Sequence, residues 1–525
     1  MLARLAPWGL ALAGLLVCLS YLAAEMARLK GGLGFPLDDS WIHLQFARNL
    51  ARGQGFSINP GQVVTGSTAP LWTVLLSLLF FLPGSVMVWT KALGIAIHLA
   101  GVEATRRLAR EVGLSDGLAV LAAVLTLATR WLVWASLSGM ETPLFVVLSL
   151  AGIIRHIRER AEPRRRPFSV AILAVAVSVR PEGILLLVLA FVDRLLVFDR
   201  NADGSWRWRA SDVRPLLVGA TVASAALAGL AVFYLWVGGS VLPTTWAAKG
   251  GDLGHHVVPD PRYLLNVLAV LFLAQPWKTG LAVGGAASLV VRLGTPRDRG
   301  LLLPLWLFAL PLVYAMLTPA PNLMLGQFGR YYFPLFPIVI VVGLVGLERA
   351  GRFLARLATP AARIAAAALV AGLILAPTVV GVWRGRTFYV QNVANVEESD
   401  VAIARWLAAR VHPEAVLAVS DIGAIKYLLP NRIIDLAGIA SPETRQEVTR
   451  AAAAGVPWDD AMVAAIERAR PDYVVAFPDW VPRVAGDPRF RAVHRLEIPD
   501  NVTMGGNEIV VYEAPWTRYR LLPRE

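Results

Sequence analysis

Two adjacent aspartates are the strongest candidates for chemistry in this sequence. Asp38 and Asp39 follow the first apolar run, in the segment Phe-Pro-Leu-Asp-Asp-Ser-Trp-Ile-His. Adjacent carboxylates repel each other, which raises the pKa of one of them and suits proton abstraction or cation binding. A helix N-cap is a simpler explanation for Asp39, but a cap uses one carboxylate and leaves the other unexplained. The pair therefore predicts a general base, with a structural cap as the alternative.

Five further ionisable residues lie beside apolar runs: Glu141, Arg180, Glu182, Lys249 and Arg330. Ionisable groups at the edge of a membrane span are costly, and they are usually functional or paired. A structural ion pair explains any single one of them equally well. Together, acids with arginine and lysine favour a site that takes a sugar acceptor and an anionic lipid phosphate.

Other catalytic chemistries find little support. His43 lies one helical turn after Asp39 and could be a metal ligand. A divalent metal beside the two carboxylates is possible, although the predicted chemistry requires no cofactor. The sequence has no Gly-rich phosphate loop, HExxH or GxSxG motif, which argues against ATP-driven transport and serine hydrolysis. The one cysteine, Cys18, lies in an apolar run and excludes a disulfide framework within one chain.

The elements that must position these residues are membrane helices. The chain is 56% hydrophobic and 17% charged, with a mean hydropathy of +0.57, whereas soluble proteins average about 45–50% apolar and about 25% charged residues. Apolar runs cover residues 6–24, 86–105, 117–135, 140–154, 168–198, 215–237, 264–291, 301–317, 331–347 and 364–383. Residues 1–383 are therefore predicted to form an all-α polytopic membrane domain with about 11 transmembrane helices.

Charge placement orients these helices. The segment from Arg384 onward holds 17 of the 50 basic and 19 of the 37 acidic residues, so the preceding part carries a net charge of +15. Its arginines gather in short loops, which is typical of cytoplasmic loops and not of a nucleic-acid surface. If all clusters are cytoplasmic, 168–198 must be a hairpin and 69–82 a re-entrant or interfacial segment. The N-terminus is then inside, and both the first outer loop (25–68) and residues 384–525 are outside.

Residues 384–525 are predicted to form a soluble α/β domain. Strands are expected at 415–421, 432–436, 473–477 and 508–512, and helices at 397–411 and 443–470. This domain is predicted to act either as a packing and substrate-shaping lid or in carbohydrate binding.

The first outer loop carries a family resemblance. From Asp38 to Thr73 it reads as Asp-Asp, an aromatic residue, Arg-Asn-Leu, Gly-x-Gly, Asn-Pro-Gly and Thr-x-Pro-Leu-Trp. This order resembles bacterial GT-C glycosyltransferases, and most of all the mycobacterial arabinofuranosyltransferase group that uses decaprenyl-phosphoryl arabinose. Shorter similar segments lie at 138–145, 180–183, 242–249, 329–337, 421–427 and 432–439. Leu-Pro-Thr-Thr at 242–245 departs from the Leu-Pro-Asn-Thr of that group.

The resemblance implies an inverting glycosyltransferase of the bacterial cytoplasmic membrane. It would move a sugar from a polyprenyl-phosphate donor to an envelope glycan or glycoconjugate acceptor on the outer face. Asp38 or Asp39 would be the base, and Lys249, Arg330 and Arg180 would bind the donor phosphate. Further candidates for substrate binding are Arg48, Asn49, Trp72, Glu141, Glu182 and Tyr331. The alternatives are a polytopic transporter or a non-catalytic scaffold for envelope assembly, each with an outer sensor domain.

Overall fold

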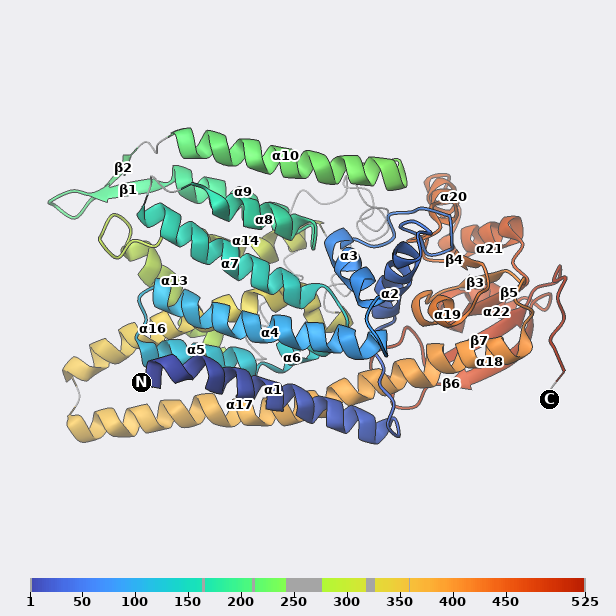
Figure 1. The fold of residues 1–525 in the computed structure, drawn as a ribbon, viewed down its shortest axis with the longest axis horizontal. Coiled ribbons are helices and arrows are strands. Elements are labelled where there is room, and N and C mark those ends of the chain that lie inside the picture. Colours follow the sequence, from blue (N-terminus) through green and yellow to red (C-terminus); the bar gives the residue numbers. More distant parts are fainter. Residues whose placement is uncertain are drawn as a thin grey trace.

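The computed structural model describes residues 2–162, 166–209, 213–241, 276–317, 326–357 and 359–523. Long helices from the first three quarters of the chain run along the long axis of the molecule, and the C-terminal sheet with its helices lies at one end (Figure 1). The molecule is therefore a helical bundle with a second, mixed body on one end.

Five helices of the described chain are long and apolar enough to cross a membrane. They are α1 (Leu2–Arg28), α4 (Val86–Glu111), α10 (Val213–Gly238), α16 (Phe336–Leu357) and α17 (Pro360–Val396). The apolar run 117–135 forms two helices, α5 (Asp116–Leu127) and α6 (Arg130–Leu137), which meet at a bend of 54° and count as one further span at most.

The remaining helices of the bundle are shorter. They are α3 (Pro70–Leu79), α7 (Thr142–Ala161), α8 (Phe168–Val177), α9 (Gly183–Leu195), α13 (Pro276–Val291) and α14 (Leu302–Leu317). By length and composition alone, the described residues support five or six spans. The larger total of about 11 stays a prediction, because it counts several of these short helices.

The predicted hairpin at 168–198 is confirmed. Helices α8 and α9 are antiparallel, since the Arg194 side chain donates to the Ser169 hydroxyl at 3.3 Å at their open ends. At the closed end, a Cβ on Gly183 would lie 2.8 Å from the Val177 nitrogen, so the two backbones approach there as only glycine permits. The turn between them contains Arg180 and Glu182.

The basic clusters meet at the end of the bundle away from the C-terminal sheet (Figure 1). Arg158 forms an ion pair with Glu111 at 2.5 Å, and Arg292 donates to the Val112 carbonyl at 3.1 Å. Arg200 donates to the Val291 carbonyl at 3.1 Å. Loops from distant parts of the sequence thus share one end, as the charge pattern predicts.

Helix α17 continues past residue 383 into a π-helical turn, η2 (Glu397–Val401), and then into α18 (Ala402–Arg410). Five strands follow: β3 (Leu417–Val419), β4 (Ile433–Asp435), β5 (Tyr473–Ala476), β6 (Arg491–Glu497) and β7 (Glu508–Glu513). Their order is β4-β3-β5-β7-β6, with β4, β3 and β5 parallel and the last two antiparallel. Each of the four predicted strand segments contains a strand, whereas the edge strand β6 was not predicted.

The first outer loop covers one face of this sheet. Alternate strand residues such as Leu417 and Val475 pack in one cluster with Ile42, Phe46 and Ile58 of that loop. The opposite face packs under α20 (Pro442–Ala453), α21 (Trp458–Ala469) and α22 (Pro482–Gly486). Because side chains alternate along a strand, the sheet needs a cover on each face. The loop and the C-terminal sheet therefore share one core.

Candidate functional site

The aspartate pair lies where the first outer loop meets both the bundle and the C-terminal body. Helix α2 (Asp38–Ala51) begins at Asp38, with Leu37 in the extended N-cap position. Neither aspartate is the N-cap, so the predicted structural cap is not realised. Both carboxylates lie in the first helical turn, and their side chains reach in different directions.

Asp38 is bound by the C-terminal body. Its two carboxylate oxygens each accept a hydrogen bond of 2.7 Å from the first turn of α19 (Gly423–Leu428): Gly423 N donates to Oδ2 and Ala424 N to Oδ1. Burial raises the pKa of Asp38 to about 7, against the lowering effect of these hydrogen bonds. The charges of Asp39 and Asp435 raise it further. A carboxyl group with this pKa can exchange a proton near neutral pH.

Asp39 faces the bundle. Its Oδ2 lies 2.6 Å from Nη2 of Arg330, which is 3% exposed and belongs to the 3-10 segment η1 (Gly326–Leu335). Nε and Nη1 of Arg330 are buried and find no hydrogen-bond partner among the described residues. Buried donors without partners are costly. Through Nε and Nη1, Arg330 can bind an anion while its Nη2 stays paired with Asp39.

Arg180 is neutralised by its neighbours. It donates to Glu141 and to Glu182, each at 2.8 Å. The Tyr331 ring lies between the two arginines, with its centroid 5.1 Å from Cζ of Arg180 and 5.5 Å from Cζ of Arg330. The structure thus brings together the predicted residues Arg180, Glu141, Glu182, Tyr331 and Arg330. Because Glu141 and Glu182 already pair with Arg180, Arg330 is the better candidate to bind a phosphate.

His43 extends this network through the first outer loop. Its Nδ1 lies 3.1 Å from the Ser67 hydroxyl and its Nε2 lies 3.3 Å from Glu141. The Ser67 hydroxyl in turn lies 3.0 Å from that of Thr73. These contacts place His43 in a polar chain. Among the described residues, no group of three or more His, Cys, Asp or Glu could hold a metal ion.

Three other predicted residues hold the fold around the site. Arg48 donates to the Tyr427 carbonyl at 2.8 Å and lies over the Tyr427 ring. Asn49 is buried and donates to the Ser57 carbonyl at 2.9 Å. Trp72 is 1% exposed and donates to the Gly139 carbonyl at 2.9 Å. Lys249 lies outside the described residues.

Two partners of the site, Gly423 and Asp400, were not among the predicted residues. Gly423 lies in the segment 421–427, which was noted only through the family resemblance. Asp400 lies in η2, is fully buried, and has two carboxylate oxygens without a partner among the described residues. The charges of Asp421 and Asp38 act on it and help to raise its pKa. No periodicity identifies either residue, because both act through contacts between distant segments.

If Asp38 is the predicted general base, the contact at Gly423 predicts an effect on turnover. A Cβ there would lie 2.2 Å from the Asp38 carbonyl oxygen and 2.7 Å from its Oδ1, so Gly423→Ala must displace α2 or α19. We expect turnover of the purified chain to fall at least about tenfold, because a small misplacement of a reacting group is costly. The control is Gly486→Ala, where nothing lies within 4 Å of an added Cβ. Equal turnover in both variants would contradict this account.

The buried carboxyl groups predict a pH-dependent stability. Burial raises the pKa of Asp400 and Asp421, and it raises the pKa of Asp435 to about 6 and of Asp38 to about 7. In the unfolded chain these groups titrate near pH 4. The folded state therefore binds more protons between pH 4 and 7, and the melting temperature should fall as the pH rises through that window.

Asp400→Asn removes one of these charges without changing the volume of the side chain. It should raise the melting temperature at pH 7 and flatten the dependence on pH. The exposed Asp479→Asn serves as the control and should change neither. A melting temperature of the Asp400→Asn chain that declines as steeply as that of the wild type would refute the account.

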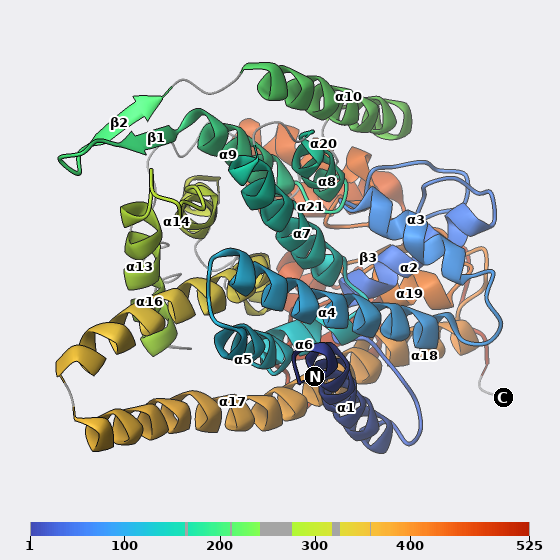
Figure 2. The ribbon, with the colours of Figure 1, turned by 60° about the vertical axis from the view of Figure 1, so that its left-hand side comes forward.

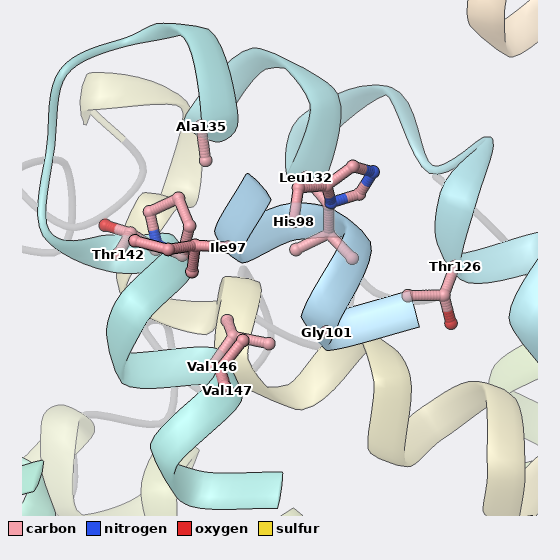
Figure 3. A pocket seen from close by; sticks show the side chains of 10 residues that line it. Ile97, His98, Gly101, Thr126, Leu132, Ala135, Thr142, Val146 and Val147 are labelled. Carbon is pink, nitrogen blue, oxygen red and sulfur yellow. The ribbon is translucent and has the colours of Figure 1, made fainter. Parts of the chain in front are cut away.

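A separate pocket lies inside the bundle between α4, α5, α6 and α7 (Figure 3). Most of its lining is apolar, and the polar exceptions are His98, Thr126 and Thr142. It contains none of the predicted site residues, and it is a packing gap under the site rather than the site itself.

Comparison with solved structures decides the fold. ArnT from Cupriavidus metallidurans in the apo state matches over 95% of this chain and 98% of that chain, with a TM-score of 0.58 and 15% identity. The same protein bound to undecaprenyl phosphate matches over 95% and 97%, with a TM-score of 0.56 and 16% identity. The chain has the GT-C fold. An Archaeoglobus fulgidus oligosaccharyltransferase matches over 97% of this chain and 76% of that chain, with a TM-score of 0.51 and 12% identity.

Sequence comparison adds one match. A domain of unknown function (DUF8728) matches residues 389–517, which begin near the end of α17 and include all five strands of the C-terminal sheet. No curated protein matches the sequence. The fold is thus shared with a protein bound to undecaprenyl phosphate and with an oligosaccharyltransferase, while the specificity of this chain has to be argued from its own residues.

Proposed function

We propose that this chain is a membrane glycosyltransferase that moves a sugar from a polyprenyl-phosphate donor to a glycan or glycoconjugate acceptor of the cell envelope. The observation that carries the proposal is the division of the aspartate pair: Asp39 pairs with the buried Arg330 of the bundle, and Asp38 faces the C-terminal body. The site then has a donor side toward the membrane and an acceptor side toward the sheet. The GT-C fold and a neighbour bound to undecaprenyl phosphate support the donor class.

On the donor side, Arg330 binds the phosphate of the lipid-linked sugar. Its Nε and Nη1 are the two unpartnered donors, and Asp39 holds the guanidinium through Nη2. Negative charge develops on the leaving phosphate as its bond to the sugar breaks, so a fixed buried cation favours that step. Arg180 orients Tyr331 and the two glutamates beside it.

On the acceptor side, Asp38 is the general base. It takes the proton of an acceptor hydroxyl, whose oxygen forms a bond to the anomeric carbon while the bond from that carbon to the phosphate oxygen breaks. The electron pair leaves with polyprenyl phosphate, and the anomeric configuration is inverted. A base lies on the face of the sugar opposite the leaving group, which fits Asp38 better than Asp39 because Asp39 already touches Arg330.

The finer features extend the resemblance of the first outer loop. The active face is the outer side of the cytoplasmic membrane, with the basic end of the bundle inside and residues 384–525 outside. Arabinofuranose is the first donor sugar to test, because the loop from Asp38 to Thr73 is most similar to that of the arabinofuranosyltransferases.

The deciding experiment reconstitutes the full chain in liposomes with radiolabelled polyprenyl-phosphate sugars and an envelope glycan acceptor. We expect label on the acceptor and release of polyprenyl phosphate, and the double variant Asp38→Asn/Asp39→Asn should give neither. A transporter would give no glycosyl product from any donor of a panel of pentoses and hexoses. That result from a folded, inserted chain would overturn the proposal.

A further inference from the structure

Two arginines lie near each other at the bend between α5 and α6, away from the aspartate pair, and a third lies two residues further along α17. Arg130 is the first residue of α6, and Arg384 and Arg386 lie on α17. Between Arg384 and Arg386, the backbone of α17 approaches α6 and α1 closely. A Cβ on Gly385 would lie 2.4 Å from the Arg130 Cβ and 2.5 Å from the Tyr21 hydroxyl. Helices α1, α6 and α17 lie side by side in both views (Figures 1 and 2).

The cluster lacks a carboxylate among the described residues. The groups that act electrostatically on Arg130 are the Tyr21 hydroxyl and the guanidinium of Arg384, and Arg130 and Arg386 both act on Tyr21. Arg130 also makes a cation–π contact with the Trp131 ring, whose centroid lies 4.7 Å from Cζ. By contrast, Arg180 and Arg330 are held by carboxylates. A half-buried cation beside a second cation needs an anion to offset the repulsion.

The helix break adds to the attraction for an anion. The N-terminus of α6 begins at Arg130, and the residue before it, Thr129, makes no side-chain cap. The first turn of a helix presents backbone N–H groups and a partial positive charge, both of which favour a phosphate. The helix start follows a bend of 54° between α5 and α6, and α6 packs beside α17.

The depth of the cluster in the membrane identifies the source of that anion. Residues 364–383 of α17 carry no charge, and a helix of that length spans about 30 Å, the thickness of the hydrocarbon core. Arg384 and Arg386 follow at once, so they lie at the level of the lipid headgroups on the side of the C-terminal body. Trp383 beside them is 60% exposed, as is common for tryptophan at this level.

We propose that Arg130 and Arg384 form a binding site for the phosphate of a membrane lipid, beside the N-terminus of α6, with Arg386 adding positive charge two residues further along α17. The site does not depend on the glycosyltransferase proposal, because it needs only a membrane-embedded bundle. The site does not include Arg330, but side-chain packing links the two regions. Trp131 stacks on Phe333, three residues after Arg330, with ring centroids 5.8 Å apart.

The test measures lipid binding to the delipidated full chain in detergent by native mass spectrometry. The probes are phosphatidylglycerol, phosphatidic acid, undecaprenyl phosphate, phosphatidylcholine and inorganic phosphate. We expect phosphatidylglycerol and phosphatidic acid to bind, and the variant Arg130→Gln/Arg384→Gln/Arg386→Gln to bind them at least about tenfold more weakly. Undecaprenyl phosphate is compared in an Arg330→Ala background, with and without the triple change, because the proposed donor site would also bind it. The matched control removes three arginines at the opposite end: Arg349→Gln/Arg356→Gln/Arg363→Gln.

The outcomes distinguish between a bulk anionic lipid and the lipid carrier as the source of the phosphate. Loss of phosphatidylglycerol and phosphatidic acid binding in the triple variant supports a bulk anionic lipid as the ligand. A loss confined to undecaprenyl phosphate, measured in the Arg330→Ala background, supports the lipid carrier. Equal binding by phosphatidylcholine, or inorganic phosphate that displaces the lipids at similar concentration, would overturn the proposal. So would unchanged binding in the triple variant. Arg384→Gln alone, at an exposed side chain, should already weaken binding without unfolding and guards against a folding artefact.

Discussion

Asp38→Asn is expected to lower kcat for sugar transfer by about 100-fold or more while donor binding survives, since a general base commonly contributes on that scale. The amide has nearly the volume of the carboxylate, and its oxygen can still accept one of the two hydrogen bonds from Gly423 and Ala424. The chain should therefore stay folded, which a melting curve checks. Asp39→Asn should act differently, because Asp39 touches Arg330 and not the acceptor.

The expected signature of Asp39→Asn is a higher KM for the lipid donor with a smaller change in kcat. Asp39→Asn should also shift the pH dependence of the transfer rate. Asp38 must be ionised to act as a base, so the rate of the wild type should rise as the pH approaches 7 and level off above it. The charge of Asp39 raises the pKa of Asp38, and its removal should shift that rise to lower pH.

These two variants exchange their roles under the competing assignment. If Asp39 is the base, Asp39→Asn abolishes turnover and Asp38→Asn shows chiefly a loss of stability, because it loosens the contact with α19. If both variants fold and both transfer sugar at the wild-type rate, no catalytic role is left for the pair.

The sequence predicted the features that depend on local pattern. The first outer loop was recognisable from its order of Asp-Asp, Asn-Pro-Gly and Pro-Leu-Trp, and the basic loops predicted which ends of the helices lie together. The hairpin around Arg180 followed from the same charges. In each case a short segment carries the signal by itself, either as a motif or as a count of arginines.

What the sequence could not supply is contact between distant segments. The hydrogen bond between Gly423 and Asp38 joins residues 385 positions apart. The edge strand β6 was missed because its residues Arg491, Arg495 and Glu497 show no apolar alternation, and it forms only through pairing with β7. Trp72 stays a predicted substrate-binding residue, and its hydrogen bond to the Gly139 carbonyl is a contact that its motif does not indicate. Tertiary packing determines the Gly423, β6 and Trp72 contacts alike.

The role of the C-terminal body follows from these contacts. Its sheet uses the first outer loop as the cover of one face, and Asn59 of that loop brackets Ile433 of β4 with two hydrogen bonds of 2.8 and 2.9 Å. A lid that only shaped access would not need to share a core with the first outer loop. These contacts therefore favour a C-terminal body that also holds Asp38 in position.

Arg330→Ala is expected to raise the KM for the donor and to lower kcat/KM by about 100-fold or more, because it removes the cation that faces the leaving phosphate. Arg330→Lys should recover part of the loss, since lysine keeps the charge but not the forked geometry that reaches Asp39 and a phosphate together. The exposed Arg52→Ala, at the end of α2, is the control and should bind donor as the wild type does.

Weaker donor binding in Arg330→Ala could also have its cause in Asp39, which is 28% exposed and would be left without this ion pair. The double variant Asp39→Asn/Arg330→Ala separates the two causes. If Arg330 serves only to pair Asp39, removing both charges should restore donor binding toward that of Asp39→Asn alone. If Arg330 binds the phosphate through Nε and Nη1, the double variant should bind donor no better than Arg330→Ala, and binding of a polyprenyl phosphate without sugar should fall in parallel.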